Sequence, residues 1–408
     1  MEIESLKELI QNNEFMNFIN ENINADTNKL RLKSFKDKSK SFDVNFAILQ
    51  IDCRNRIKKK LPEIFENKNF LFPHILSTEQ CTAQEIAKLH ASLLGNNESV
   101  LDMTAGLCID SYYISKSAKE VTALELNPIT ALVSQFNMSN LTSNVNVVNA
   151  DCVQFVKNTT KQFSSIFIDP ARRGENNKRL FSLSDCAPNI LELIPYLRKI
   201  SDTLYIKASP MLDITQSLKE LNNCVTDTWI IGLNNECKEV LFKVDLKSAC
   251  TYESNIHTIN IDNNGSQKLS QLSNNKHINH IHNLDLRTDI YLYEPNSCIM
   301  KARIFSALID KYDLSAISAN SHLFVSTDLI NDFPGRKFNI SEIIPFKSSE
   351  IKNINKKHPQ INVSVRNFKL SADELKKKIK VHDGGDKYMF GTTDKKNNAI
   401  LLICDKVH

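Results

Sequence analysis

The sequence lacks the features that mark membrane proteins, disulfide-stabilised proteins and zinc ribbons. No run of eighteen apolar residues occurs in its 408 residues, so neither a membrane-spanning helix nor a membrane partner is expected. The first residues carry early acidic side chains and no apolar segment, so a secretory signal is not expected. None of the ten cysteines pairs as C-x-x-C. Reduced thiols in a cytoplasmic protein are the simplest interpretation.

Charge is distributed unevenly along the chain, although the formal net charge is only +4. Residues 29–60 contain eleven Lys or Arg against three Asp or Glu, and residues 330–408 contain sixteen against nine. Basic segments of this kind suit a polyanionic partner such as RNA. The alternative is that these lysines belong to helix faces that only contact water.

The apolar pattern predicts a helical N-terminal region followed by an α/β domain. Residues 1–75 have the polar and basic character of surface helices. From residue 99, short apolar strands alternate with helical stretches, and the strands 225–233 and 239–246 form an expected hairpin. This order predicts a doubly wound, Rossmann-like domain over 76–250, with a seven-stranded sheet that ends in an antiparallel hairpin.

The last part of the chain predicts two small α+β domains. Residues 251–333 begin with a stretch rich in Asn, Ser and His, which predicts a partly flexible connection, and continue as a compact segment. Residues 334–408 alternate as βαβαββ, which predicts a domain with its own sheet. Ser371 and Glu374 have the spacing of a capping box at the start of its last helix.

Three histidines in the Asn-rich stretch are the strongest candidates for a metal site. His280 and His282 would share one face of a strand, with His277 nearby. A fourth ligand is missing and the surrounding composition is that of a polar connection. No metal is therefore expected.

Four acidic residues stand where four successive predicted strands end: Asp102, Glu125, Asp151 and Asp169. The carboxyl ends of parallel strands form the crevice in which a doubly wound sheet binds its ligands. Glu125 follows the first strand by about twenty residues, where an acid can accept both ribose hydroxyls. Each acid alone would more often be a helix cap or a loop residue, but together they predict a nucleoside pocket. The turn after Asp102 contains Gly106 but no G-x-G-x-x-G fingerprint.

Several motifs resemble one enzyme family. Residues 99–245 resemble the class I S-adenosylmethionine-dependent methyltransferases. More narrowly, nearly the whole chain resembles a bacterial family of these enzymes that carries a ferredoxin-like segment and a C-terminal THUMP-like domain. The matching motifs are EQCTAQE at 79–85, DMTAGLCID at 102–110, LELNP at 124–128, NADC at 149–152, FIDPARRG at 167–174, YLYEPN at 291–296, DFPGR at 332–336 and RNFKLSADELKKK at 366–378.

The resemblance implies a site for S-adenosyl-L-methionine at the first three strand ends. Its residues would be Asp102, Thr104, Ala105, Gly106, Asp110, Glu125, Leu126, Asn127, Asp151 and Cys152. The loop from Asp102 to Gly106 would line the methionine portion. Glu125 would hold the ribose, and Asp151 with Cys152 the adenine. The chain departs from the family at Ala105 and Cys108, because glycines are usual there and a Cβ atom hinders close approach or positive φ.

The resemblance also places the reaction at the fourth strand end, in the segment Asp169, Pro170 and Arg172. Asp169 could accept a hydrogen bond or a proton from a nucleobase nitrogen. Arg172 or Arg173 could stack on a base or bind a phosphate, although a structural salt bridge is the alternative for both. Lys207, after the fifth strand, could contact a substrate phosphate or simply face the solvent.

The function that these observations favour is methylation of a base nitrogen in RNA, either tRNA or rRNA. THUMP domains elsewhere recognise RNA, and the basic segments agree with such a partner. A non-catalytic RNA-binding or assembly protein with a degenerate cofactor loop is the first alternative. A small-molecule methyltransferase is the second.

Overall fold

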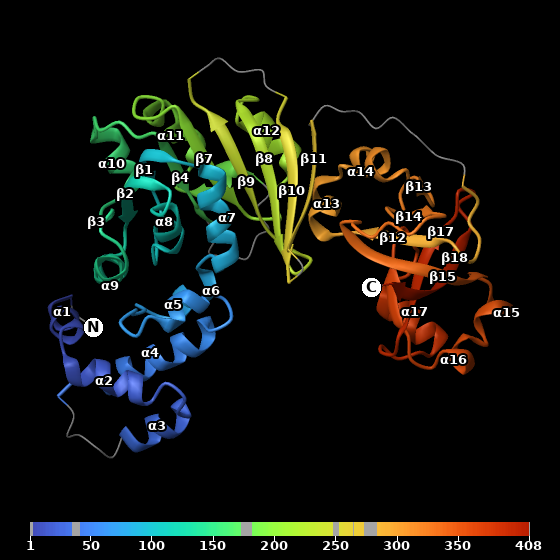
Figure 1. Cartoon of the computed structure of the whole chain (residues 1–408), viewed down its shortest axis with the longest axis horizontal. Coiled ribbons are helices and arrows are strands. Elements are labelled where there is room, and N and C mark those ends of the chain that lie inside the picture. The colour runs from blue at the N-terminus through green and yellow to red at the C-terminus, as the bar shows by residue number, and fades with distance from the viewer. Residues whose placement is uncertain are drawn as a thin grey trace. The chain divides into compact units, whose positions relative to one another are not determined.

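The computed structural model describes residues 3–34, 41–172, 182–247, 253–263, 265–272 and 284–407. It divides into two compact units, drawn in Figure 1. Unit 1 comprises Met1–Thr226 and Val240–Tyr252. Unit 2 comprises Asp227–Glu239 and Glu253–His408. Among the described helices, none is both long and apolar enough to cross a bilayer.

The expected Rossmann-like sheet is present. Its strands are β1 (Asn97–Asp102), β2 (Ala118–Glu125), β3 (Val145–Asn149), β4 (Ser165–Ile168), β7 (Thr203–Ala208), β8 (Val225–Leu233) and β9 (Glu236–Asp245). The order is β8-β9-β7-β4-β1-β2-β3; the pairs from β7 to β3 are parallel, and β9 is antiparallel to β7. Every residue of β4 is buried, as a parallel strand covered on both faces requires. The parallel strands therefore share one carboxyl edge.

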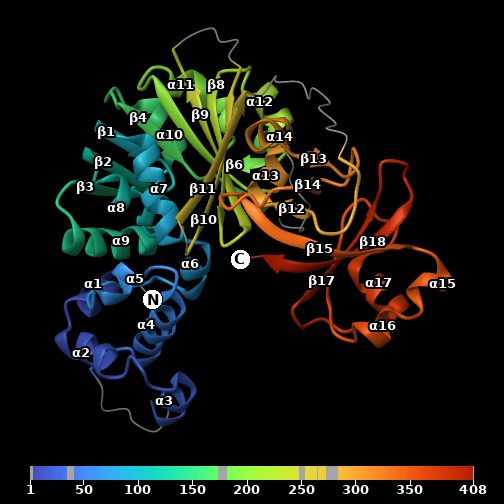
Figure 2. The ribbon, with the colours of Figure 1, turned by 45° about the vertical axis from the view of Figure 1, so that its right-hand side comes forward.

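The described helices of unit 1 precede, connect or cover these strands (Figure 2). They are α1 (Ile3–Ile10), α2 (Asn13–Glu21), α3 (Thr27–Ser34), α4 (Val44–Ile57), α5 (Pro62–Glu66), α6 (Ile75–Gln80), α7 (Gln84–Leu94), α8 (Ile109–Ile114), α9 (Pro128–Leu141), α10 (Cys152–Asn158), α11 (Ile190–Leu197) and α12 (Ile214–Glu220). A separate two-stranded ladder pairs β5 (Ala171–Arg172) with β6 (Cys186–Ala187).

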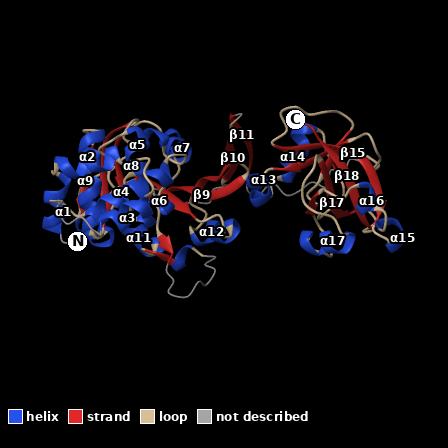
Figure 3. Cartoon of the chain, turned by 90° about the horizontal axis from the view of Figure 1, so that it is seen from below, coloured by secondary structure: helices blue, strands red, loops and turns tan. Residues whose placement is uncertain are grey.

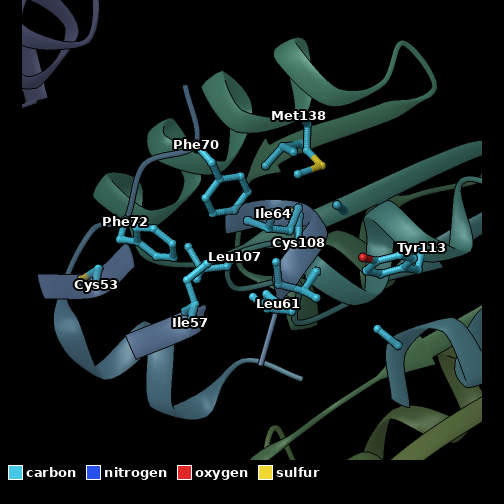
Figure 4. Packing of buried hydrophobic residues seen from close by; sticks show 14 residues of the cluster. Cys53, Ile57, Leu61, Ile64, Phe70, Phe72, Leu107, Cys108, Tyr113 and Met138 are labelled. Carbon is cyan, nitrogen blue, oxygen red and sulfur yellow. The ribbon is translucent and has the colours of Figure 1, made fainter. Parts of the chain in front are cut away.

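The N-terminal helices pack directly on the loop that follows β1. One buried cluster joins Ile57 of α4 and Ile64 of α5 to Leu107 and Cys108. Figure 4 shows the Leu107 and Cys108 side chains beside those of Ile57, Leu61 and Ile64. Met138 of α9 belongs to the same cluster. The N-terminal helices thus pack against the loop that is the candidate cofactor site.

One expectation about the sheet is wrong. The segment 251–285 was expected to be a partly flexible connection, but it contains the antiparallel pair β10 (Asn255–Asp262) and β11 (Gly265–Leu272). β10 pairs in parallel with β8, so the sheet has nine strands instead of seven. In β10, Ile256, Thr258, Ile259 and Asn260 are buried, and because two of these four residues are polar, the strand was not evident as an apolar run in the sequence.

Unit 2 contains a second, seven-stranded sheet, drawn in red in Figure 3. Its strands are β12 (Tyr291–Pro295), β13 (Ser315–Ala316), β14 (Phe324–Ser326), β15 (Gly335–Pro345), β16 (Asn362–Val365), β17 (Lys387–Thr393) and β18 (Ala399–Val407). The order is β13-β14-β12-β15-β18-β17-β16. Residues 334–408 therefore do not have a sheet of their own, because β12 pairs with β15.

The helices of unit 2 are α13 (Ser297–Ala302), α14 (Phe305–Tyr312), α15 (Ser348–Ile351), α16 (Ile354–Lys357) and α17 (Ala372–Ile379). α13 ends before Arg303, which adopts a left-handed conformation with φ of 57° and so separates α13 from α14. The capping box of Ser371 and Glu374 is confirmed.

Three of the sequence motifs converge on one buried carboxylate in unit 2. Glu294 of YLYEPN is 3% exposed and accepts hydrogen bonds from Arg336 of DFPGR and from Arg366 of RNF, at 2.6 and 2.7 Å. Gly335 allows this approach, since a Cβ atom there would lie 2.1 Å from the Glu294 carbonyl oxygen. Segments far apart in the sequence are thereby fixed to one another.

Candidate functional site

The loop after β1 is bonded to both neighbouring strands. The Met103 N–H donates to the Phe167 carbonyl of β4, and the Ala105 N–H donates to the Leu124 carbonyl of β2, each at 2.9 Å. The Thr104 hydroxyl accepts from the Asp169 N–H at 2.8 Å. These bonds bring the ends of β1, β2 and β4 together at one edge.

Asp102 lies beneath this loop rather than on its surface. Its side chain is buried, and its two oxygens accept hydrogen bonds from the Thr104 N–H and the Ser111 hydroxyl. Burial raises the pKa of Asp102 to about 7, against the opposing effect of the Ser111 hydrogen bond. This carboxyl group therefore holds the loop in shape.

Two loop residues adopt the left-handed conformation. Gly106 has φ of 53° and Cys108 has φ of 59°. Cys108 is the residue that replaces a glycine of the family pattern, and such a conformation costs a non-glycine residue roughly 1–3 kcal/mol. Its side chain is fully buried against the N-terminal helices, which offsets this strain. No atom lies within 4 Å of the Cβ position of Gly106, so the surface above it is open.

Glu125 ends β2 and connects the loop to the next helix. One carboxylate oxygen accepts from the Gly106 N–H at 3.0 Å and the other from the Asn127 N–H at 2.7 Å. Asn127 in turn caps α9 through its side-chain oxygen. Leu126, between them, is 69% exposed, which is unusual for a leucine and leaves an apolar surface beside the carboxylate.

Asp151 and Cys152 stand at the end of β3. One Asp151 oxygen caps α10 by accepting from the Val153 and Gln154 N–H groups at 2.7 and 3.3 Å. The residue is exposed, so its carboxylate also faces the solvent. Burial raises the pKa of the half-buried Cys152 to about 11, so its thiol stays protonated at neutral pH.

Asp169 follows β4 and forms an ion pair with Lys207 of β7. The Lys207 ammonium lies 2.6 Å from an Asp169 oxygen and donates to the Thr82 hydroxyl at 2.9 Å. The Asp169 side chain is 41% exposed, whereas that of Lys207 is 12% exposed. Pro170, next in the chain, is buried. The Asp169 carboxylate is therefore accessible to solvent, and the less exposed Lys207 ammonium fixes its position.

A second carboxylate completes this network. Asp110 accepts from the Thr82 hydroxyl at 2.5 Å, lies 2.7 Å from His90 Nδ1 and 3.9 Å from the Lys207 ammonium. Burial opposes its ionisation, but Lys207 and His90 outweigh that effect and lower the pKa of Asp110 to about 2. Asp110 is therefore ionised and forms a second ion pair with Lys207.

Sequence reasoning missed two residues of this network. Thr82 lies within the EQCTAQE motif, which marked the segment but not the side chain. His90 lies on the buried face of α7, and its ring packs against Phe167. No spacing rule connects either residue to Asp110 or Lys207, since the contacts join three distant parts of the chain.

Some predicted residues are not placed by the structure. The backbone of Arg172 belongs to β5 and pairs with Cys186. Arg173 and the three histidines His277, His280 and His282 lie outside the described residues. Their proposed roles remain predictions from the sequence.

Family models match the C-terminal part of the chain, and a solved structure is similar to nearly all of it. A family model described as a ferredoxin-like domain matches residues 291–334, and one described as THUMP domain-like matches residues 335–406. The solved structure of a candidate methyltransferase from Porphyromonas gingivalis W83 is similar over 98% of this chain and 99% of that chain. Its TM-score is 0.85 and its sequence identity 27%.

The chain therefore contains ferredoxin-like and THUMP domain-like segments, and its fold matches that of the candidate methyltransferase over nearly its whole length. The resemblance seen in the motifs and the α/β fold class are thereby confirmed, apart from the two additional strands. An uncharacterized RNA methyltransferase of Mycoplasma mobile is 37% identical over 79 residues, which are 19% of this chain. The chain spans only about a fifth (22%) of the length of that relative.

The raised pKa of Asp102 predicts a pH-dependent stability. A carboxyl group with a folded pKa near 7 binds its proton more tightly in the folded than in the unfolded chain, so its contribution is lost as pH rises from about 4 through 7. We expect the wild type to lose free energy of unfolding relative to Asp102→Asn over this range, by up to about 1.4 kcal/mol per pH unit. Urea unfolding at several pH values measures the difference.

Glu98→Gln is the control for this measurement, because Glu98 is an exposed carboxylate at the other end of β1. Its difference from the wild type should change little with pH. A pH-independent gap between the wild type and Asp102→Asn would contradict the buried, protonated state of Asp102.

Proposed function

We propose that the protein is an S-adenosylmethionine-dependent methyltransferase that methylates a base nitrogen in tRNA or rRNA. One arrangement carries the proposal: the loop 102–108 and the acidic residues at four neighbouring strand ends lie along one edge of the sheet. The family's methyltransferase fold agrees with this chemistry.

The residues at the first three strand ends fit a nucleoside. Both oxygens of Glu125 are oriented by backbone N–H groups and retain lone pairs for the two ribose hydroxyls. The exposed Leu126 offers an apolar face to the adenine ring. The Asn149 side chain donates to the Glu125 and Leu126 carbonyls, which joins this position to the end of β3, where Asp151 and Cys152 follow. The open surface at Gly106 leaves room for the methionine portion. Asp102 would act indirectly, by holding the loop.

The bound cofactor would supply an electrophilic methyl group on a sulfonium centre. The chain's part is then to align the target nitrogen and to exclude water, and alignment alone can contribute about 7–11 kcal/mol. Asp169 stands exposed at the end of β4 and can accept a hydrogen bond or a proton from the base nitrogen. Arg172 and Arg173 follow it and could stack on the base or bind a phosphate.

Lys207 would act as a positioning residue. Its ammonium is held between Asp169, Thr82 and Asp110, with little solvent exposure. This favours support of the Asp169 carboxylate over both alternatives that the sequence left open, a phosphate contact and a solvent-facing lysine. His90 and Thr82 would in turn orient Asp110, so that three side chains fix the position of one lysine.

A basic pocket in unit 2 supports RNA as the substrate class. The pocket has a volume of about 780 Å³, and Tyr312 and Phe333 are among its lining residues. Its cationic residues are Lys268, Lys311, Lys337, Lys406 and Arg336, of which Arg336 also binds Glu294, against the acids Asp262 and Asp332. Several cations beside aromatic rings suit a phosphate backbone and its bases. The printed name of the Mycoplasma mobile relative also specifies RNA.

The N-terminal basic run gives weaker support. Arg54 is buried and donates to the carbonyls of Asn67 and Phe70, and Lys60 donates to those of Thr78 and Glu79. These cations stabilise the helical region instead of extending toward a polyanion. RNA contacts are therefore proposed for unit 2 in preference to residues 54–60.

A non-catalytic RNA-binding protein is the second candidate. The observation that favours it is the substitution of the usual glycines by Ala105 and Cys108, since the left-handed Cys108 is strained. Against it, both neighbouring strand ends still bond to the loop, and Gly106 keeps an open surface. A small-molecule methyltransferase gives no role to the basic pocket.

The proposal predicts that Asp169→Asn abolishes most methyl transfer. Asparagine keeps the size of the side chain but removes the proton acceptor, so the rate should fall by about 10²–10⁴-fold while cofactor affinity changes little. Labelled S-adenosylmethionine and RNA from cells that lack base modification provide the assay. Glu98→Gln, at the opposite end of β1, should retain the wild-type rate. An undiminished rate in Asp169→Asn would exclude its role.

The basic pocket predicts a salt-dependent RNA affinity. Within the described part of the chain, Lys268 and Lys406 are exposed and form no ion pair. The double substitution Lys268→Ala, Lys406→Ala should weaken RNA binding and reduce the slope of log affinity against log salt by about 2. Lys119→Ala with Lys247→Ala removes the same charge from unit 1 and should leave the slope unchanged. Equal slopes in all three proteins would contradict an RNA contact in this pocket.

A further inference from the structure

Two cysteines of unit 2 lie together although 61 positions separate them in the sequence. Cys237 is near the start of β9 and half-buried; Cys298 is the second residue of α13 and fully buried. Neither belongs to a motif that the methyltransferase site uses. Their placement follows from the geometry of the β8–β9 hairpin.

The hairpin turn sets the position of Cys237. β8 ends at Leu233 and β9 begins at Glu236, with Asn234 and Asn235 between them at φ of 51° and 63°. Two residues with positive φ form a type I′ turn, in which the flanking residues pair directly. Gly232 is therefore opposite Cys237, and the two positions point to the same face of the sheet.

The missing side chain of Gly232 makes room for the other sulfur. A Cβ atom at Gly232 would lie 2.5 Å from Cys298 Sγ, so this sulfur occupies the space above the glycine. Cβ atoms of directly paired residues are about 4.5–5.5 Å apart, which places the Cys237 side chain beside the same space. The Cys298 thiol donates to the Ile259 carbonyl of β10 at 3.6 Å, and the two sulfurs are close enough for each thiol to shift the pKa of the other.

Further contacts fix the two elements to each other. The Asn235 side chain accepts from the Ser297 N–H at 2.8 Å, and the Asn235 N–H donates to the Asn260 side chain at 2.9 Å. The first turn of α13 and the hairpin tip are therefore held in register.

We propose that Cys237 and Cys298 form a reversible thiol oxidation site, in which Cys237 is the reactive thiol and Cys298 the resolving one. The oxidant is hydrogen peroxide. The Cys237 sulfur attacks one peroxide oxygen, so that an S–O bond forms, the O–O bond breaks and the other oxygen leaves as water after protonation. The Cys298 sulfur then displaces the hydroxyl group of the sulfenic acid, an S–S bond forms, and the Cys298 proton leaves with it as a second water.

The acidities of the two thiols agree with these roles. The hydrogen bond with Cys298 holds the pKa of Cys237 below its usual range, Lys301 acts in the same direction, and burial opposes both. The same hydrogen bond together with burial raises the pKa of Cys298. Thiolate character makes a cysteine susceptible to peroxide, and Cys237 also has the solvent access that Cys298 lacks.

The test is peroxide treatment of the full reduced chain, followed by alkylation and peptide mass mapping. We expect a loss of two hydrogen atoms, one linked peptide pair that contains Cys237 and Cys298, and complete reversal by dithiothreitol. Cys298→Ser should instead leave a sulfenic acid on Cys237 that dimedone traps, and Cys237→Ser should remove both products.

Cys152→Ser is the matched control, because Cys152 is also half-buried and burial raises its pKa to about 11. This variant should form the Cys237–Cys298 bond as the wild type does. If either serine variant does not fold, the peptide map of the wild type decides alone. A map in which Cys237 stays reduced, or is linked to any cysteine other than Cys298, would overturn the proposal.

Discussion

The bonds between the loop 102–108 and its two neighbouring strands are the constraint on which the candidate site depends. The Thr104 hydroxyl holds the backbone of Asp169, and the Glu125 carboxylate holds the backbone of Gly106. Through these contacts the region proposed for the cofactor and the residue proposed for the base are fixed to the same rigid strands. A shift of the loop would move the cofactor region and Asp169 at once. The contacts that hold the loop in place therefore determine the geometry of the site.

That support comes from two different sources. The N-terminal helices bury Leu107 and Cys108 and so stabilise a left-handed residue where the family usually has glycine. The buried Asp102 holds the loop through hydrogen bonds, and the charged group of Asp110, Lys207 and Asp169 fixes the neighbouring strand ends. Apolar packing thus compensates for the altered loop sequence, and electrostatics orients the carboxylate that is proposed to meet the substrate.

The sequence predicted the parts of the protein that follow local periodicity. The parallel strands were evident from their apolar runs, and the four acidic residues followed from the position of the strand ends. β10 was missed, because its buried residues Thr258 and Asn260 are polar, so the strand does not stand out as an apolar run. Thr82 and His90 were missed for another reason, since only the folded chain brings them to Asp110. The convergence of Glu294, Arg336 and Arg366 was likewise invisible, although each residue lies in a recognised motif.

The most direct test of the account is calorimetric titration of S-adenosylmethionine into the wild type and into Glu125→Ala. We expect the wild type to bind S-adenosylmethionine with near-micromolar affinity, about −8 kcal/mol. Loss of the carboxylate that holds Gly106 and would hold the ribose should weaken binding at least tenfold, or about 1.4 kcal/mol. Equal affinity in the two proteins, or no binding by a folded wild type, would contradict a nucleoside pocket at this edge of the sheet.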